Sequence, residues 1–345
     1  MDNNKNKKPK KVACFSLCGG GHFGYAEVAI LKDLENYKEY LDIKNISGVS
    51  VGSIVAALYA IGYTATELEK IMFDFDFDKL IRDSSFPYIK LYGYYGMYHA
   101  GPLEDEIERL IRVKTHIRNC TFNQVTKMNL TVIATNLNMQ CPKFFNRETY
   151  PDLPVSKAVR MIISSPLVVS PILFEGDLFG DGGIYMNYPI IMFEDRLDET
   201  IGVTFSAHNE NRDGTLNKRV PINDVYDYIR SLGITMSRAA YVSQVRPKFL
   251  DRSIVVKIDQ NIGSMQFNLT REQKQYIFDC GAKSAREQIE KLLGISDEII
   301  QEKEVMKPTI PIETESEVET MVKYIVTVDP KMMNSLCSSA AAGTA

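Results

Sequence analysis

The sequence predicts an α/β fold built on a largely parallel central sheet. Between residues 11 and 206, β-branched apolar runs alternate with segments of helical periodicity, a pattern typical of βα units that feed a parallel sheet. The chain has 345 residues, of which 45% are hydrophobic and 24% charged, which is enough apolar material to bury a large core. Glycines mark the points where the first strands turn into helices.

The first two βα units are the most clearly marked elements. An apolar run predicts a strand over 11–18, and the periodic segment after it predicts a helix over 24–36. A second apolar run predicts a strand over 43–49, which leads directly into a predicted helix over 52–61. Both strands therefore end at a glycine-containing turn.

The later elements follow from the same periodicities. They predict helices near 66–82, 102–113 and 155–163 and strands at 130–137, 142–146 and 200–206. The short runs "ILF" and "LFG" predict a hairpin that turns through Glu175-Gly176-Asp177. Two amphipathic helices are predicted over 221–244 and 270–293, with the strand "SIVVKID" between them.

Composition divides the chain into three parts. The lysine-rich head, 1–10, has too little apolar content to fold, so we expect it to be disordered, and its charge also allows contact with an anionic membrane surface. Residues 11–295 show no linker composition and are predicted to form one domain. The extension 296–345 ends in the low-complexity stretch "SSAAAGTA", and we expect it to be partly disordered.

Charge and cysteine usage exclude several classes of protein. A net charge of −4, from 40 basic and 44 acidic residues, predicts no attraction to nucleic acid. No apolar run approaches the ~20 residues of a membrane-spanning helix, and no secretory leader is recognisable. The six cysteines are scattered without metal-ligand or disulfide-framework spacing. These features predict a cytoplasmic protein with no metal and no organic cofactor.

The stretch "FSLCGGGHFG" contains the first candidate motif. Gly19, Gly21 and Gly24 spell G-x-G-x-x-G after a predicted strand, the fingerprint of dinucleotide binding. That fingerprint requires a carboxylate at the end of the second strand, where this chain has Gly48-Val49-Ser50. The alternative is that the backbone N–H groups of this loop hold the oxyanion of a reacting ester.

The stretch "GVSVG" has both the sequence and the context of a nucleophile elbow. Ser50 stands between the predicted strand 43–49 and the helix that follows. Small residues, here Gly48 and Gly52, are needed on either side because the strand and helix pass closely at such a turn. Ser50 is therefore a candidate nucleophile.

A serine nucleophile needs a base, and the stretch "FGDGGIYMNYPI" offers one. Asp181 follows a short predicted strand and precedes two glycines, which would expose its carboxylate on a loop. D-G-G is also a common turn sequence, so a solvated aspartate in a hairpin turn is the alternative.

In this order, the three motifs resemble those of the patatin-like phospholipase family over about residues 11–195. The resemblance implies a three-layer α/β/α fold in which Ser50 is the nucleophile and Asp181 is the base. It also implies an oxyanion hole formed by the backbone of Gly19, Gly20 and Gly21.

The family resemblance further implies the reaction and the substrate class. The domain 11–295 would be a lipid acyl hydrolase of phospholipase A or lysophospholipase type, acting on a lipid or phospholipid. The chain departs from the family pattern at Phe23, where the family usually has arginine or lysine.

Two other functions stay open from the sequence. Ser50, Asp181 and His208 occur in the order of an α/β-hydrolase triad, with His208 as the base. A carboxylate base would keep activity well below pH ~6.5, where a free imidazole becomes protonated. The second alternative is a lipid-binding or membrane-tethering protein that keeps the fold without turnover.

An aromatic cluster lies between the predicted helices in "FPYIKLYGYYGMYHAGP". Its members are Phe86, Tyr88, Tyr92, Tyr94, Tyr95 and Tyr98. The cluster is either a lid or interfacial patch that admits acyl chains, or a set of tyrosines that pack the loop onto the core.

Overall fold

A computed structural model describes residues 11–82, 87–207, 219, 221–258, 262–263, 266 and 268–295. These residues belong to one compact unit that ends at Ile295. The head 1–10, the extension 296–345 and His208 lie outside the described residues.

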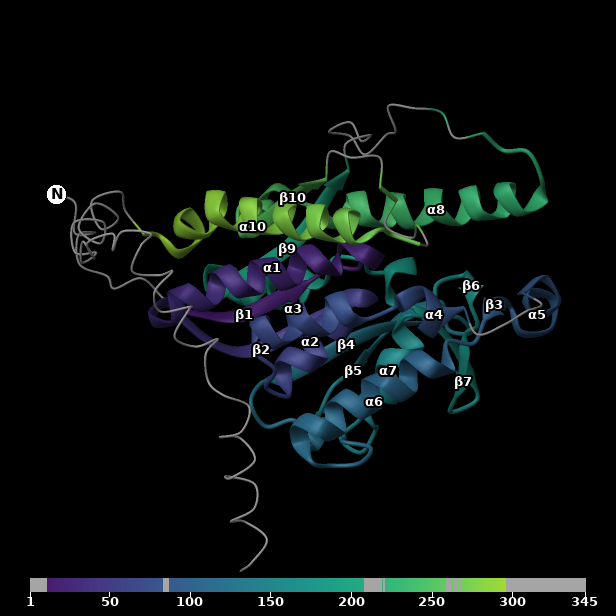
Figure 1. The fold of residues 1–345 in the computed structure, drawn as a ribbon, viewed down its shortest axis with the longest axis horizontal. Coiled ribbons are helices and arrows are strands. Elements are labelled where there is room, and N and C mark those ends of the chain that lie inside the picture. The colour runs from purple at the N-terminus through teal and green to yellow at the C-terminus, as the bar shows by residue number, and fades with distance from the viewer. Residues whose placement is uncertain are drawn as a thin grey trace, which may run out of the picture. The chain divides into compact units, whose positions relative to one another are not determined.

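The centre of the fold is a sheet of eight strands in the order β10-β9-β1-β2-β4-β8-β7, with β5 also paired to β4 (Figure 1). The strands are β1 (Val12–Leu17), β2 (Leu41–Val49), β4 (Asn129–Asn136), β5 (Cys141–Phe145), β7 (Ile172–Phe174), β8 (Asp177–Asp181), β9 (Thr200–Ala207) and β10 (Ser253–Ile258). The first five strands of this order are mutually parallel, whereas β5, β8 and β7 pair in antiparallel fashion. The predicted α/β fold class with a largely parallel sheet is confirmed.

Helices cover one face of the sheet, as Figure 1 shows. They are α1 (Gly24–Leu34), α2 (Val51–Ala60), α7 (Val155–Ile162) and α10 (Arg271–Leu293), with α3 (Ala65–Asp74) and α6 (Gly101–Thr115) packed outside them. Leu17 points to this face, because a Cβ on Gly52 of α2 would lie 3.2 Å from the Leu17 Cβ. The core of this layer therefore forms between the strands and the apolar sides of these helices.

A second, smaller core lies on the opposite face. Side chains alternate along an extended chain, so Cys18 points away from the side of Leu17 and packs with Tyr188, Ile190 and Phe249. These partners come from the 3₁₀ helix η5 (Pro189–Glu199), from the residue before it, and from α9 (Pro247–Leu250). The end of α8 (Val225–Gln244) adds Tyr241 to the same cluster.

Some element boundaries differ from the sequence prediction. The helix predicted over 66–82 is two helices, α3 and α4 (Phe77–Ile81), because the Asp76 side chain accepts a hydrogen bond from the Lys79 N–H at 3.1 Å and starts a new helix. The predicted hairpin turn is shorter by one residue: Asp177 already pairs with Phe174, which leaves Glu175 and Gly176 as a two-residue turn with positive φ at both positions.

The sequence analysis did not predict several short elements. They are α5 (Pro87–Tyr94), α9, the two-stranded sheet of β3 (Gly96–Tyr98) and β6 (Leu167–Val169), and the 3₁₀ helices. Among the described residues, no helix is long and apolar enough to cross a membrane.

Strand β4 brings the serine and aspartate motifs together. One edge of β4 pairs with β2 as far as Val49 opposite Ile133, and the next residue of β4, Ala134, pairs with Asp181 of β8. Because β5 occupies the other edge over the same stretch of β4, β8 must continue the edge that β2 leaves at Ser50. Residues 131 positions apart in the sequence thereby become neighbours.

Candidate active site

Ser50 occupies a tight turn between β2 and α2. Its φ of 52° and ψ of −130° are unfavourable for a residue with a side chain, which is the strained geometry of a nucleophile elbow. A Cβ on Gly48 would lie 2.4 Å from the Gly52 carbonyl oxygen, and a Cβ on Gly52 would lie 2.5 Å from the Cys18 carbonyl oxygen. The turn can therefore form only with glycine at both positions.

Ser50 directly contacts Asp181. The Ser50 hydroxyl donates a hydrogen bond of 2.8 Å to Asp181 Oδ2, and the Gly183 N–H donates one of 2.7 Å to Asp181 Oδ1. The main chain of Asp181 is held as well, because its N–H donates to the Ser164 carbonyl and its own carbonyl accepts from Thr135 Oγ1, both at 2.9 Å. Both carboxylate oxygens are thus oriented by the protein before any substrate binds.

The environment of Asp181 changes its acidity. Its side chain is 7% exposed, and burial raises the pKa of Asp181 to about 6, although the hydrogen bonds from the Gly183 N–H and the Ser50 hydroxyl act in the opposite direction. A carboxyl with a pKa of about 6 is ionised at neutral pH and is a stronger base than an ordinary aspartate. Such a group can accept the proton of a hydroxyl that already points at it.

The glycine-rich loop lies against the elbow. A Cβ on Gly19 would approach the Ser50 Cβ to 3.2 Å, so this loop passes directly beside the serine. The Gly19 N–H, however, donates to the Asn187 carbonyl at 3.0 Å. The N–H groups of Gly20 and Gly21 open the 3₁₀ turn that leads into α1, at a helix start where N–H groups have no helical acceptor.

Asn187 is the site residue that the sequence analysis missed. Its side-chain Nδ2 donates to the Gly19 carbonyl at 3.0 Å, so Asn187 contacts the glycine loop through both its side chain and its main chain. The signal that could have found it is a polar residue six positions after Asp181, between the apolar neighbours Met186 and Tyr188.

Phe23, the departure from the family pattern, is a core residue. It is 8% exposed, and its ring packs against that of Phe205 with the centroids 5.2 Å apart. An apolar side chain suits this position because the surroundings supply an aromatic contact.

The contacts that the structure gives for the described histidines are with groups other than Ser50. His22 packs edge-on against Phe77, and burial lowers the pKa of its imidazole. His99 packs against Tyr94 with ring centroids 5.0 Å apart, and His116 ends α6 with a positive φ. Within the described residues, the hydrogen-bond partner of the Ser50 hydroxyl is Asp181, whereas His208 lies outside them.

The tyrosines of the aromatic cluster differ in burial. Tyr92, Tyr94 and Tyr95 are 94%, 58% and 63% exposed at the end of α5, whereas Tyr98 of β3 is buried. Packing against the core therefore accounts for Tyr98 alone of these four, and the side chains of Phe86 and Tyr88 lie outside the described residues.

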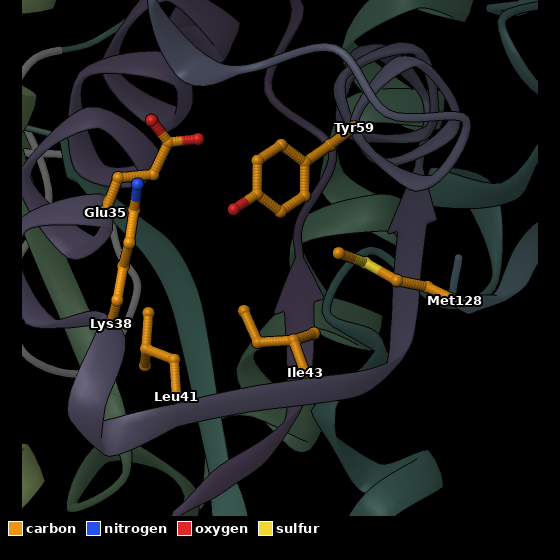
Figure 2. Close-up of a pocket in the computed structure, with 6 residues that line it drawn as sticks. All are labelled: Glu35, Lys38, Leu41, Ile43, Tyr59 and Met128. Atoms are coloured by element: carbon orange, nitrogen blue, oxygen red, sulfur yellow. The ribbon is translucent and has the colours of Figure 1, made fainter.

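A pocket outside the candidate site opens beside the first residues of β2, at the end of the strand opposite Ser50 (Figure 2). Its lining consists of Glu35, Lys38, Leu41, Ile43, Tyr59 and Met128. Glu35 accepts a hydrogen bond from the Ala65 N–H at 3.0 Å, which ties it to the start of α3. None of the predicted site residues lines this pocket, and in the part of the chain that the structure describes no three His, Cys, Asp or Glu side chains gather as a metal site would require.

This chain is similar to several known proteins. A family model described as patatin-like phospholipase matches residues 15–193, a range that contains all three motifs. The uncharacterized protein R571 of Acanthamoeba polyphaga mimivirus is 55% identical over 296 residues, which is 84% of this chain and 99% of that protein. The probable lipid hydrolase 463L of Invertebrate iridescent virus 6 is 28% identical over 53% of this chain and 63% of its own length. The crystal structure of VipD from Legionella pneumophila matches with a TM-score of 0.55 at 15% identity, over 85% of this chain and 72% of VipD, which is a likeness of fold alone.

Proposed function

This chain belongs to the patatin-like phospholipase family, and from that premise we propose that Ser50 and Asp181 form a catalytic dyad that cleaves fatty-acyl esters of lipids. The observation that carries the proposal is the direct hydrogen bond of 2.8 Å from the Ser50 hydroxyl to Asp181 Oδ2. A nucleophile and a base in contact, with the base oriented by a third group, are the parts that acyl transfer requires.

In the first half of the reaction, Ser50 Oγ forms a bond to the acyl carbonyl carbon while its proton passes to Asp181 Oδ2. The carbonyl π electrons move to the oxygen, which becomes the oxyanion of a tetrahedral intermediate. When this intermediate collapses, the ester C–O bond breaks and the leaving alcohol takes the proton from Asp181. Ser50 is then acylated.

In the second half, Asp181 accepts a proton from water while the water oxygen attacks the acyl carbonyl. The second intermediate collapses by breaking its bond to Ser50 Oγ, which recovers the proton from Asp181. The fatty acid leaves and the resting enzyme is restored. Each proton that Asp181 accepts is returned within the same half-reaction.

The oxyanion hole consists of the N–H groups of Gly20 and Gly21 in this proposal. The Gly19 N–H is engaged by the Asn187 carbonyl, so Gly19 orients the loop instead of donating to the substrate. The N-terminus of α2 begins beside Ser50 and adds its positive end to the same region.

The substrate class rests on the family and on the name of the iridescent-virus relative, a probable lipid hydrolase. We propose a phospholipase A or lysophospholipase type of specificity and peripheral contact with membranes in a cytoplasmic setting. The alternative from the sequence, a lipid-binding protein without turnover, takes its support from Phe23, which stands where the family usually has a basic residue.

Labelling with a fluorophosphonate probe separates turnover from binding alone. The probe reacts with a serine that a base has activated, so we expect stoichiometric labelling at Ser50 together with release of fatty acid from phosphatidylcholine vesicles. Mass spectrometry of the labelled peptide and a free fatty acid assay measure the two results. Binding to vesicles without either labelling or fatty acid release would favour the lipid-binding alternative.

The raised pKa of Asp181 predicts the acid limit of activity. Only the ionised carboxylate can accept the serine proton, so kcat/KM should fall about tenfold per pH unit below a midpoint near pH 6. This limit lies close to that of a free imidazole, so the pH profile does not separate the two bases as the sequence alone had led us to expect. A profile on a soluble ester that stays flat down to pH 4.5 would contradict the raised pKa.

A further inference from the structure

We infer that Asn187 is a positioning residue. It holds the glycine loop at a fixed position relative to Ser50 and Asp181. The inference rests on the proposed function, since its consequence is the alignment of the Gly20 and Gly21 N–H groups with the oxyanion. Asn187 does not touch the reacting atoms in this account. It acts through Gly19.

Asn187 and Gly19 are joined by two hydrogen bonds of opposite direction. The Gly19 N–H donates to the Asn187 main-chain carbonyl, and Asn187 Nδ2 donates to the Gly19 carbonyl, each at 3.0 Å. The peptide groups before and after the Gly19 Cα are thus both hydrogen-bonded to Asn187. Such a pair determines both the position and the tilt of the residue directly before the proposed oxyanion donors.

The same side chain lies against the aspartate loop. The point where a Cβ on Gly183 would lie is 2.7 Å from Asn187 Oδ1 and 3.1 Å from Asp181 Oδ1. A Cβ on Gly19 would lie only 2.2 Å from Asn187 Oδ1. Two glycines therefore make room for one amide, which spans the gap between the glycine loop and the loop that carries the base.

The segment around Asn187 is itself held in place. Gln244, the last residue of α8, donates through Nε2 to the Tyr185 carbonyl at 2.7 Å and accepts from the Tyr188 N–H at 3.1 Å. The Met186 N–H donates to the Gly182 carbonyl at 2.8 Å, which closes the turn after Asp181. Asn187 is consequently part of a chain segment that begins at Asp181 and is held in place by these hydrogen bonds.

Loss of the amide should loosen the glycine loop while the Ser50–Asp181 contact remains. We expect Asn187→Ala to lower kcat on a soluble fatty-acyl ester about 10²-fold, the order of effect of one misplaced oxyanion donor, with KM changed less than about twofold. Asn187→Asp keeps the shape, removes the Nδ2 donor and places a like charge near Asp181. It should lower kcat similarly and also move the acid limit of the pH profile upward.

Asn136→Ala is the matched control. Asn136 is a buried asparagine, whereas Asn187 is half-buried, and Asn136 Nδ2 donates to Asp177 Oδ2 at 2.7 Å between two strands of the sheet. This variant should lose stability without losing kcat or moving the pH limit. Kinetics are compared at a temperature where circular dichroism shows all variants folded.

Amide hydrogen exchange supplies a measurement that does not depend on activity. Peptides covering residues 19–24 should exchange faster in Asn187→Ala than in the wild type, and those of Asn136→Ala should not. Unchanged exchange in that loop, or a kcat equal to that of the wild type, would overturn the inference. If the wild type itself shows no turnover while the exchange result holds, the proposed function has failed and the positioning of the loop by Asn187 stands.

Discussion

Replacing Ser50 with alanine is expected to lower the turnover of a soluble fatty-acyl ester by roughly 10⁴-fold or more. The substitution removes the atom that forms the covalent intermediate in the proposed mechanism and leaves the glycine loop and Asp181 in place. The thermal unfolding midpoint should stay within a few degrees of the wild type, because alanine keeps the Cβ and loses one hydrogen bond to a carboxyl that can take up a proton instead.

Two further serine variants sharpen this test. Ser50→Gly should be equally inactive but more stable than the wild type, since a φ of 52° with a ψ of −130° suits a residue without a side chain. Ser47→Ala is the matched control: Ser47 is a buried serine of β2, three residues before Ser50, and its hydroxyl donates to Ser16 Oγ at 3.2 Å. Turnover by Ser50→Ala at the level of Ser47→Ala would end the proposal of a serine hydrolase.

Replacing Asp181 with asparagine is expected to reduce turnover by several orders of magnitude, whereas His208→Ala should reduce it by less than tenfold. An amide cannot accept the hydroxyl proton during attack, even though it fills the same space. If His208 were instead the base of a triad, its removal would cost about as much as removal of the serine. Kinetics of both variants on one soluble ester measure the difference.

The same aspartate variant should also change how the unfolding midpoint depends on pH. The pKa of Asp181 in the folded protein is about 6, above the ordinary value of 3.8, so the folded state binds more protons than the unfolded state between these values. The stability of the wild type should therefore fall as the pH rises from about 4 to about 6. Asp181→Asn has no charge to bury, so its unfolding midpoint should exceed that of the wild type at pH 7, and this advantage should shrink as the pH falls from about 6 to about 4.

Asp177→Asn is the control for the aspartate. Asp177 begins the strand that ends at Asp181, and its carboxylate accepts from Asn136 Nδ2 and not from Ser50. This variant should keep its turnover. An active Asp181→Asn beside an inactive His208→Ala would refute the dyad and favour the triad.

The local sequence was sufficient to predict most of what makes the site chemically recognisable. Gly48 and Gly52 flank Ser50 at a junction of two periodicities, and the steric demand of that turn is a property of the chain around it. The alternation of apolar runs likewise predicted the α/β class, because burial on both faces of a parallel sheet leaves a continuous apolar pattern in each strand. Such features depend on neighbours within a few residues, so the sequence carries them by itself.

Other features depend on contacts that no local pattern encodes. Glu27 lies in a helical segment where the sequence gives no sign of burial, yet it is 1% exposed, and burial raises the pKa of its carboxyl well above the ordinary value. The break between α3 and α4 was missed because a single capping side chain at Asp76 outweighed continued helical periodicity. Burial of Glu27 depends on the elements that pack against α1, whereas the cap at Asp76 competes with continuation of the helix over the same few residues.

The sequence by itself determined which residues we propose for acyl transfer: a serine on a glycine-flanked turn, an aspartate before two glycines and a glycine-rich loop. Only the tertiary structure decided how these three meet. Strand β4 pairs with β2 up to Val49 and then with Asp181, which brings the aspartate beside the serine, and Asn187 Nδ2 donates a hydrogen bond to the Gly19 carbonyl of the glycine loop. The physical reason is that strand register and a hydrogen bond between residues 168 positions apart are set by the packing of the whole sheet, whereas a turn is set by the few residues that form it.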